Sequence, residues 1–267
     1  MSHFTVMVVG RTDNDYEEIL EPYDENMEVC EHMDRTKEQI HKEFMDCYGN
    51  IVATNKPASD LSEFEKLTLS LDDVTPKWCM GWCGQELDED GNTLSRYNDD
   101  AKWDWYEVGG RWSGSLILKS GETGELGTKS WTNKDREIPA DRADQALKCQ
   151  IDWDAMNEDA KVRAAKDWDE LFDPNPEHCM WRPEYVEKQR KVHLELYGTK
   201  EEYVKRRGVW TPYAVVTEDG WHAPGDMGWW GMSSDETKDR DEFDQKFADL
   251  LAEQDDDAVI TMVDCHI

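Results

Sequence analysis

Three histidines and one aspartate are the residues of this sequence best suited to bind a metal ion or move a proton. In the closing segment Val263-Asp-Cys-His-Ile267, strand alternation places Asp264 and His266 on one face. His3 lies near His266 if the first and last strands pair antiparallel, and His222, in a glycine-rich loop, could approach the same edge. This set suits a divalent transition metal such as zinc. No fixed ligand spacing supports the site, and solvated terminal histidines are the alternative interpretation.

A second candidate site is the glycine-punctuated segment 221–231. Its tryptophans could form an aromatic wall that stacks a base or another ring, with His222 beside them. The glycines would let a ligand approach the backbone closely. The alternative interpretation is that these tryptophans close one end of the core. The residues concerned are Trp221, Trp229 and Trp230, interrupted by Gly225, Gly228 and Gly231.

Residues 103–118 predict a tryptophan-rich β-hairpin. Aromatic and branched residues flank Gly109-Gly110, a pair that supplies the positive φ angles of a two-residue hairpin turn. Alternation then gives one face for burial and one face with an acid, a phenol and a guanidinium that could bind a ligand. The first face carries Trp103, Trp105 and Trp112, and the second carries Asp104, Tyr106 and Arg111.

The elements that must position these residues indicate an α+β fold in a single domain over residues 1–267. A ferredoxin-like or related mixed sheet, with helices mainly on one face, is the expected architecture. Residues 141–207 have helical periodicity and predict a helical insertion or lobe. The order strand, helix, strand at the end of the chain predicts a crossover onto a parallel neighbour. The expected elements are strands at 2–9, 210–217 and 258–267, and helices at 35–47, 62–71, 152–172, 183–197 and 234–253. One more short helix is expected to open at the capping-box pattern Thr199–Glu202.

Charge is the most unusual property of the composition. The formal net charge is −31, and 34% of the residues are charged. Residues 12–46 and 234–257 hold most of the dense acidic runs. This charge argues against direct nucleic-acid binding and against anionic membrane surfaces. The partners that remain compatible with this charge are basic molecules, metal cations, or a protein that normally binds nucleic acid.

The seven cysteines form no disulfide framework. Cys79 and Cys83 are separated by three residues and no second pair follows, which disfavours zinc-ribbon and thioredoxin interpretations. The N-terminal stretch lacks the pattern of a signal or membrane segment. We therefore expect a cytoplasmic protein with reduced thiols and no membrane association.

Several segments resemble a set of uncharacterised phage and prophage proteins. The resemblance spans both ends and the middle of the chain. It implies a viral or mobile-element origin, and hence the host cytoplasm, but no activity for particular residues. It rests on the opening Met-Ser-His-Phe-Thr-Val, Pro22–Asn26, the Trp-Asp-Trp-Tyr and Gly-Gly-Arg-Trp segments of 103–112, Met227–Gly231 and the closing Val-Asp-Cys-His-Ile.

Three functions follow, in order of preference. The first is a non-enzymatic, phage-type acidic accessory protein that binds and inhibits a host factor, as an anti-defence protein or a nucleic-acid mimic. It is favoured because classical nucleotide and hydrolase motifs are absent, and it needs no cofactor. The second is a small-molecule or nucleotide-binding protein, or a sponge for such a molecule, using the Trp221–Trp230 loop and the Asp104/Tyr106/Arg111 face. The third is the metal-dependent hydrolase. The oligomeric state is not set by the sequence.

Overall fold

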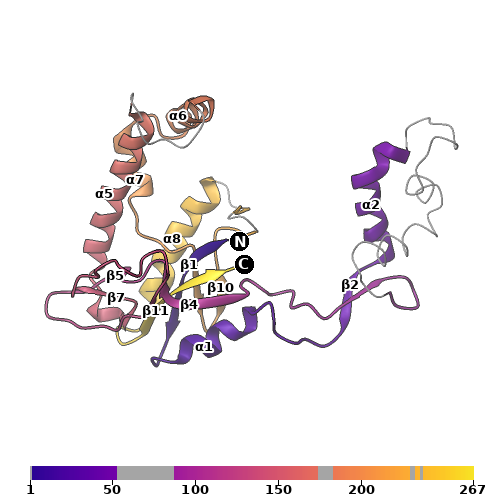
Figure 1. Ribbon diagram of the computed structural model, residues 1–267, viewed down its shortest axis with the longest axis horizontal. Helices are drawn as coiled ribbons and strands as arrows, with labels where there is room; N and C mark the ends of the chain where they lie inside the picture. Colours follow the sequence, from indigo (N-terminus) through magenta and orange to yellow (C-terminus); the bar gives the residue numbers. More distant parts are fainter. Residues whose placement is uncertain (1, 53–86, 174–182, 229–231, 235–236) are drawn as a thin grey trace. The chain divides into compact units, whose positions relative to one another are not determined.

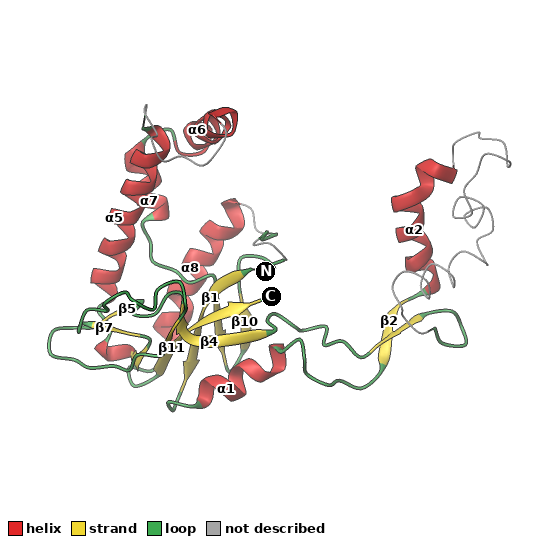
Figure 2. Cartoon of the chain, in the orientation of Figure 1, coloured by secondary structure: helices red, strands yellow, loops and turns green. Residues whose placement is uncertain are grey.

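The computed structural model describes residues 2–52, 87–173, 183–228, 232–234 and 237–267 (Figures 1 and 2). The helix expected at 62–71, the Cys79–Cys83 segment, Trp229 and Trp230 lie outside these residues. The chain packs as two compact units, Met1–Glu25 with Asp100–Ile267, and Asn26–Asp99. The sequence analysis predicted one domain over residues 1–267 and did not anticipate these two units. No helix among the described residues is both long and apolar enough to cross a membrane.

The first unit is built on a seven-stranded mixed sheet in the order β10-β9-β1-β11-β4-β6, with β8 also paired to β11. The α+β class is therefore confirmed, and the ferredoxin-like detail stays a prediction. The strands are β1 (His3–Gly10), β4 (Trp105–Gly110), β6 (Thr128–Lys129), β8 (Gln145–Leu147), β9 (Ala214–Thr217), β10 (Gly220–His222) and β11 (Val259–His266). A separate two-stranded sheet joins β5 (Leu116–Ile117) to β7 (Arg142–Ala143).

The two ends of the chain form the centre of this sheet. β1 and β11 pair antiparallel over their full length, from His3 opposite His266 to Gly10 opposite Val259. All residues of β11 are buried, as expected for a strand covered on both faces. Figure 1 shows the resulting closeness of the N- and C-termini.

Apolar side chains cover both faces of the sheet. On one face, Met7 and Met262 belong to a core that includes Phe243 and Phe247 of α8 and Met156 of α5. On the other, Phe4, Val6 and Val263 pack with Leu20 of α1 and with Trp103. Both faces carry a helix, but the long helices α5 and α8 pack on the first face and only the short α1 on the second. The helices of this unit are α1 (Asp15–Leu20), α5 (Trp153–Phe172), α6 (Pro183–Tyr197), α7 (Lys200–Arg207) and α8 (Thr237–Glu253), with 3-10 turns at Glu21–Tyr23 and Lys148–Gln150.

The helical segment predicted within 141–207 begins at α5, after the short strands β7 and β8. The Asp152 side chain accepts a hydrogen bond from the amide of Ala155 and caps α5. The predicted stripe of this helix is buried, namely Met156, Ala160, Ala164 and Trp168. Thr199 caps α7 by accepting from the Glu202 amide, as its sequence pattern predicts. Local sequence signals therefore determine these helices.

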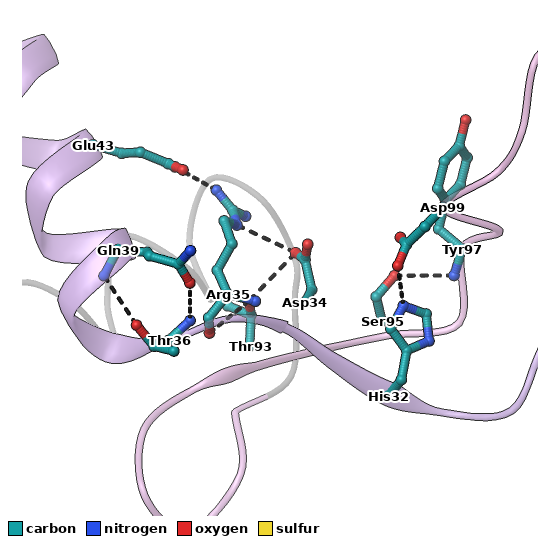
Figure 3. A network of polar contacts seen from close by, with 10 residues as sticks. All are labelled: His32, Asp34, Arg35, Thr36, Gln39, Glu43, Thr93, Ser95, Tyr97 and Asp99. Atoms are coloured by element: carbon teal, nitrogen blue, oxygen red, sulfur yellow. Dashed lines mark hydrogen bonds and ion pairs between the residues drawn. The ribbon is translucent and has the colours of Figure 1, made fainter.

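The second unit contains β2 (His32–Arg35), β3 (Thr93–Ser95) and α2 (Lys37–Val52). Figure 3 shows the contacts at the start of α2. The Gln39 amide donates to the Thr36 hydroxyl while the Thr36 amide donates to the Gln39 side chain, which forms a capping box. Thr36 is therefore the cap, and α2 begins at Lys37, two residues after the predicted start at 35. Asp34 and Glu43 form ion pairs with Arg35.

The predicted hairpin across Gly109-Gly110 is wrong. β4 pairs with β11, placing Trp105 opposite His266 and Val108 opposite Val263, while β5 pairs with β7. β11 offers a long buried strand whose backbone groups need partners, and β5 is only two residues long. The two glycines do have positive φ angles, 80° and 51°, but they end a strand and lead into turns at 111–114.

The predicted crossover onto a parallel neighbour is also corrected. β9 is parallel to β1, β1 is antiparallel to β11, and β10 is antiparallel to β9. β10 and β11 therefore run in the same direction, but β9 and β1 separate them. The connection through α8 spans two strands because β1 occupies the position beside β11.

Gly109 tests how tightly the turn is packed. A Cβ at Gly109 would lie 2.4 Å from Oδ2 of Asp144, whereas a Cβ at Gly121 would meet nothing within 4 Å. Both have similar φ angles, 80° and 88°. We expect Gly121→Ala to lower the free energy of unfolding by about 1 kcal/mol from backbone strain. Gly109→Ala should cost about 1–3 kcal/mol more, because the Asp144 carboxylate must shift. Chemical denaturation checks this, and equal losses in both variants would contradict the close packing.

Candidate functional site

Two histidines from the two ends of the chain stand side by side on the sheet. His3 and His266 are opposite one another in the β1–β11 ladder, and their ring centroids are 4.9 Å apart. Trp105, from the neighbouring β4, stacks on His266 at 5.6 Å and meets His3 edge-on at 5.6 Å. Trp105 is 42% exposed, so the pair lies beneath a partly open indole.

Each imidazole is held by its own carboxylate. Nδ1 of His3 lies 2.8 Å from Oδ1 of Asp264, and Nδ1 of His266 lies 2.6 Å from Oδ1 of Asp104. In the described part of the chain, neither Nε2 atom has a hydrogen-bond partner. A carboxylate at Nδ1 favours the tautomer with its proton there, which leaves Nε2 as an acceptor. The two side chains are 12% and 7% exposed, so most of each ring is shielded.

Asp264 joins this pair to the turn after β4. It is fully buried, and its second oxygen accepts the Arg111 amide at 2.8 Å. A Cβ at Gly110 would lie 2.4 Å from the Cβ of Asp264, so only glycine fits at that position. Asp264 therefore positions both the His3 ring and the start of the turn.

A second buried carboxylate, Asp144, holds the rest of the turn. It accepts the Ser113 hydroxyl at 2.8 Å, the Gly114 amide at 2.6 Å and the Gly127 amide at 2.9 Å. These donors compensate for removing the charge from water. The turn that carries Arg111 and Trp112 is thus fixed by two buried aspartates.

On the same face of the sheet lies a cavity of about 520 Å³. Its walls come from the sheet, the turn, the segment before β7, and helices α5, α7 and α8. Its most notable feature in a chain of charge −31 is a set of basic side chains. They are Arg136, Arg142, Arg163, Arg207 and Arg240.

Several polar groups in the cavity are only partly satisfied by the protein. Arg142 forms no ion pair with the described residues, and Arg163 lies 3.5 Å from Asp159. The Oγ of Ser115 is buried and has no hydrogen-bond partner among the described residues. Trp112, Tyr203 and Trp210 add aromatic surface to the same walls, which combine rings with cationic donors. Such walls can bind an anion that carries a ring.

A buried acid lies among these arginines. Asp244 accepts the Thr211 hydroxyl at 2.9 Å and lies 3.8 Å from Nε of Arg240. Burial raises the pKa of its carboxyl above the ordinary value, although Thr211 and Arg240 partly oppose that shift. The Asp244 carboxyl therefore accepts a proton at higher pH than an exposed aspartate.

The cavity and the histidine pair are neighbours. Thr5 lines the cavity and stands opposite Asp264 in the ladder, two residues from His3 on the same strand face. Two residues along a strand span about 7 Å. Trp112, another cavity residue, directly follows Arg111, whose amide binds Asp264.

The predicted metal set assembles only in part. His3, Asp264 and His266 converge as the antiparallel pairing predicts, but His222 does not join them. His222 lies in β10, opposite Val215 of β9, and strands β9 and β1 separate it from β11. Burial, followed by nearby Lys246, lowers the pKa of His222. No group of three or more His, Cys, Asp or Glu side chains that could hold a metal ion is present in the described residues.

The predicted ligand-binding face of Asp104, Tyr106 and Arg111 is not a single surface. Tyr106 contacts Trp103 at 5.0 Å in the core on the other face, and burial raises its pKa to about 12. Asp104 binds His266, and Arg111 contributes its amide to Asp264. The alternation predicted for 103–112 does not hold along this segment, because Trp103 precedes β4 and the turn at 111–114 ends the strand before Arg111.

Trp221 lies partly buried against Phe4 and Tyr23. It lines a small cavity of about 110 Å³ that also includes Lys102 and Tyr213. This favours the core interpretation for Trp221. The rest of the proposed aromatic wall, at Trp229 and Trp230, lies outside the described residues.

Sequence reasoning missed the arginine cavity. Its basic residues are spread from position 136 to position 240 and follow no spacing motif. No local signal marks them, because Arg163 and Arg240 stand in segments where acids outnumber bases. No family model, curated protein or solved structure matches the chain.

Proposed function

We propose that this protein binds a small anionic molecule bearing phosphate or a similar group in the arginine-lined cavity. The observation that carries the proposal is the gathering of five arginines around one concavity in a strongly acidic chain. This is the second of the three functions considered from the sequence, the small-molecule or nucleotide-binding one, at different residues.

Electrostatics explains why such a gathering has a use. In a chain with net charge −31, long-range repulsion disfavours the approach of any anion. A local cluster of guanidinium groups is therefore needed to make one region attractive. Guanidinium matches phosphate and carboxylate with paired donors, which favours arginine over lysine for this role.

The size and the lining also fit a nucleotide-like ligand. The volume of about 520 Å³ lies within the usual range for small-molecule sites. Trp112 and Trp210 offer ring faces, and the buried Ser115 hydroxyl offers an unused polar contact. A phosphate beside an aromatic ring would use both kinds of wall.

The proposal predicts a charge-specific loss of binding. We expect Arg142→Gln with Arg163→Gln to weaken the binding of sulfate and of ADP by at least about tenfold, because two cationic donors leave the cavity. Isothermal titration calorimetry at constant ionic strength measures the affinities.

The matched control changes the net charge equally. Arg11→Gln with Arg96→Gln removes two exposed arginines, each paired with a surface glutamate. This control should bind both probes as the unaltered protein does. An unaltered protein that binds neither probe, or equal losses in both double variants, would contradict the site.

Asp244 predicts a pH dependence. Its pKa is raised by burial, so its negative charge disappears as the pH falls through that raised value. Sulfate keeps its charge between about pH 4 and pH 7, so its affinity should rise on acidification as the cavity loses a carboxylate. Asp244→Asn should bind sulfate up to about tenfold more tightly at neutral pH, because no carboxylate charge repels the anion there.

The same variant should show a smaller rise in affinity on acidification. Calorimetric titrations across the pH range measure this. Parallel pH profiles in the variant and the unaltered protein would show that Asp244 does not face the bound anion.

The second candidate is the acidic accessory protein that binds a basic host protein. The observation that favours it is the exposed acidic run at the end of α8, where Glu253 and Asp255–Asp257 are all exposed. Not all predicted acids contribute to such a surface. Asp241 pairs with Arg206 and Asp244 faces the cavity, so neither belongs to a solvated outer face.

Charge reversal tests this candidate. Host proteins retained by the immobilised chain at low salt should be released as salt rises, because screening weakens surface attraction. Glu253→Lys with Asp257→Lys should retain them less well without changing the melting temperature. If the amount of retained protein changes neither with salt nor with the charge reversal, an acidic docking surface is excluded.

A further inference from the structure

We propose that the paired histidines are a proton-transfer site that hydrolyses a phosphodiester bond of the molecule bound in the arginine cavity. The inference rests on the proposed function, because the cavity must hold the ligand. It assigns a reaction to His3 and His266, whose geometry no structural need of the sheet explains.

The arrangement has the parts that acid–base catalysis requires. Two imidazoles lie 4.9 Å apart, and each has its Nδ1 fixed by a separate carboxylate. Both Nε2 atoms lack hydrogen-bond partners in the described part of the chain. The carboxylates set the tautomer and the orientation of each ring, so both free nitrogens are prepared to exchange protons.

A purely structural role would make poor use of these residues. The histidine pair, at one end of the two central strands, brings two imidazole rings together with two carboxylates, of which Asp264 is fully buried. Apolar side chains would stabilise the same ladder without the cost of burying charge. The partly exposed Trp105 over the rings offers a surface for a ligand that reaches them.

The proposed step needs one base and one acid. The Nε2 of one neutral imidazole takes a proton from water as the water oxygen bonds to phosphorus. The bond from phosphorus to the leaving oxygen breaks, and the Nε2 of the other imidazole, protonated beforehand, gives its proton to that oxygen. The products are a phosphomonoester and an alcohol. The first imidazole ends the step protonated and the second ends it neutral. Transfer of one proton through solvent from the first ring to the second restores both.

The position of the pair selects the kind of substrate. Thr5 in the cavity wall and His3 are two residues apart on one strand face, a span of about 7 Å. A diester with a further anionic group could therefore place that group among the arginines and its ester bond at the imidazoles. The cavity positions the substrate, which is where much of the rate gain of such a site would come from.

The experiment follows hydrolysis of bis(p-nitrophenyl) phosphate and of a 5′-phosphorylated, 3′,5′-linked dinucleotide by the full chain. We expect turnover of both, and a loss of about 10²- to 10⁴-fold in kcat for His3→Gln and for His266→Gln. Asp104→Asn should lower kcat at least about tenfold with little change in KM, because it orients His266 without touching the substrate. Added imidazole should partly restore His266→Gly, a rescue that a merely structural histidine would not show.

Two measurements keep the outcomes separate. His32→Gln is the control, because His32 also pairs with an aspartate, Asp99, but in the second unit; its turnover should be unchanged. Sulfate binding in each variant reports whether the fold and the cavity are intact. Sulfate binding without turnover of either diester overturns the proton-transfer site and leaves the proposed function standing. Turnover that survives both histidine substitutions also overturns it, and loss of sulfate binding in the unaltered protein overturns both proposals.

Discussion

The buried carboxylate of Asp264 is the interaction on which the site depends. It accepts Nδ1 of His3 and the amide of Arg111, so one side chain joins the first strand, the last strand and the turn after β4. A buried charge that loses a partner costs about 3–5 kcal/mol, so neither donor can move away freely. Position 110 must be glycine, because any Cβ there would collide with Asp264.

The turn fixed in this way connects two features that are remote in sequence. Arg111 donates its amide to Asp264 beside the histidines, and Trp112 lines the cavity on the same face of the sheet. Asp144 secures the following residues through Ser113 and Gly114. A turn held by buried carboxylates would keep the proposed binding cavity and the histidine pair in a fixed relation to one another.

The arginine-lined cavity differs in charge from the rest of this acidic chain. A chain with so much negative charge repels anions everywhere except where cations are concentrated. The arginines of the cavity come from helices α5, α7 and α8, from β7 and from the loop before it, and acids such as Asp244 offset part of their charge. The strongly acidic chain and its arginine-lined cavity therefore differ in charge, which supports the proposed binding of small anions in the cavity.

The sequence by itself determined the features that depend on neighbouring residues. Hydrophobic period and capping residues indicated α5, α6 and α7, and the alternation of the terminal segments indicated β1 and β11. The nearness of His3 to His266 was conditional on antiparallel pairing of these two strands, which the tertiary structure supplies. Only the tertiary structure decided what depends on strand order. The insertion of β1 and β9 between β10 and β11 separates His222 from the other histidines, and the pairing of β4 with β11 replaces the expected hairpin. Strand partners are chosen by long-range burial and hydrogen bonding, which leave no local signal, and the arginine cavity formed in the same way from residues with no common spacing.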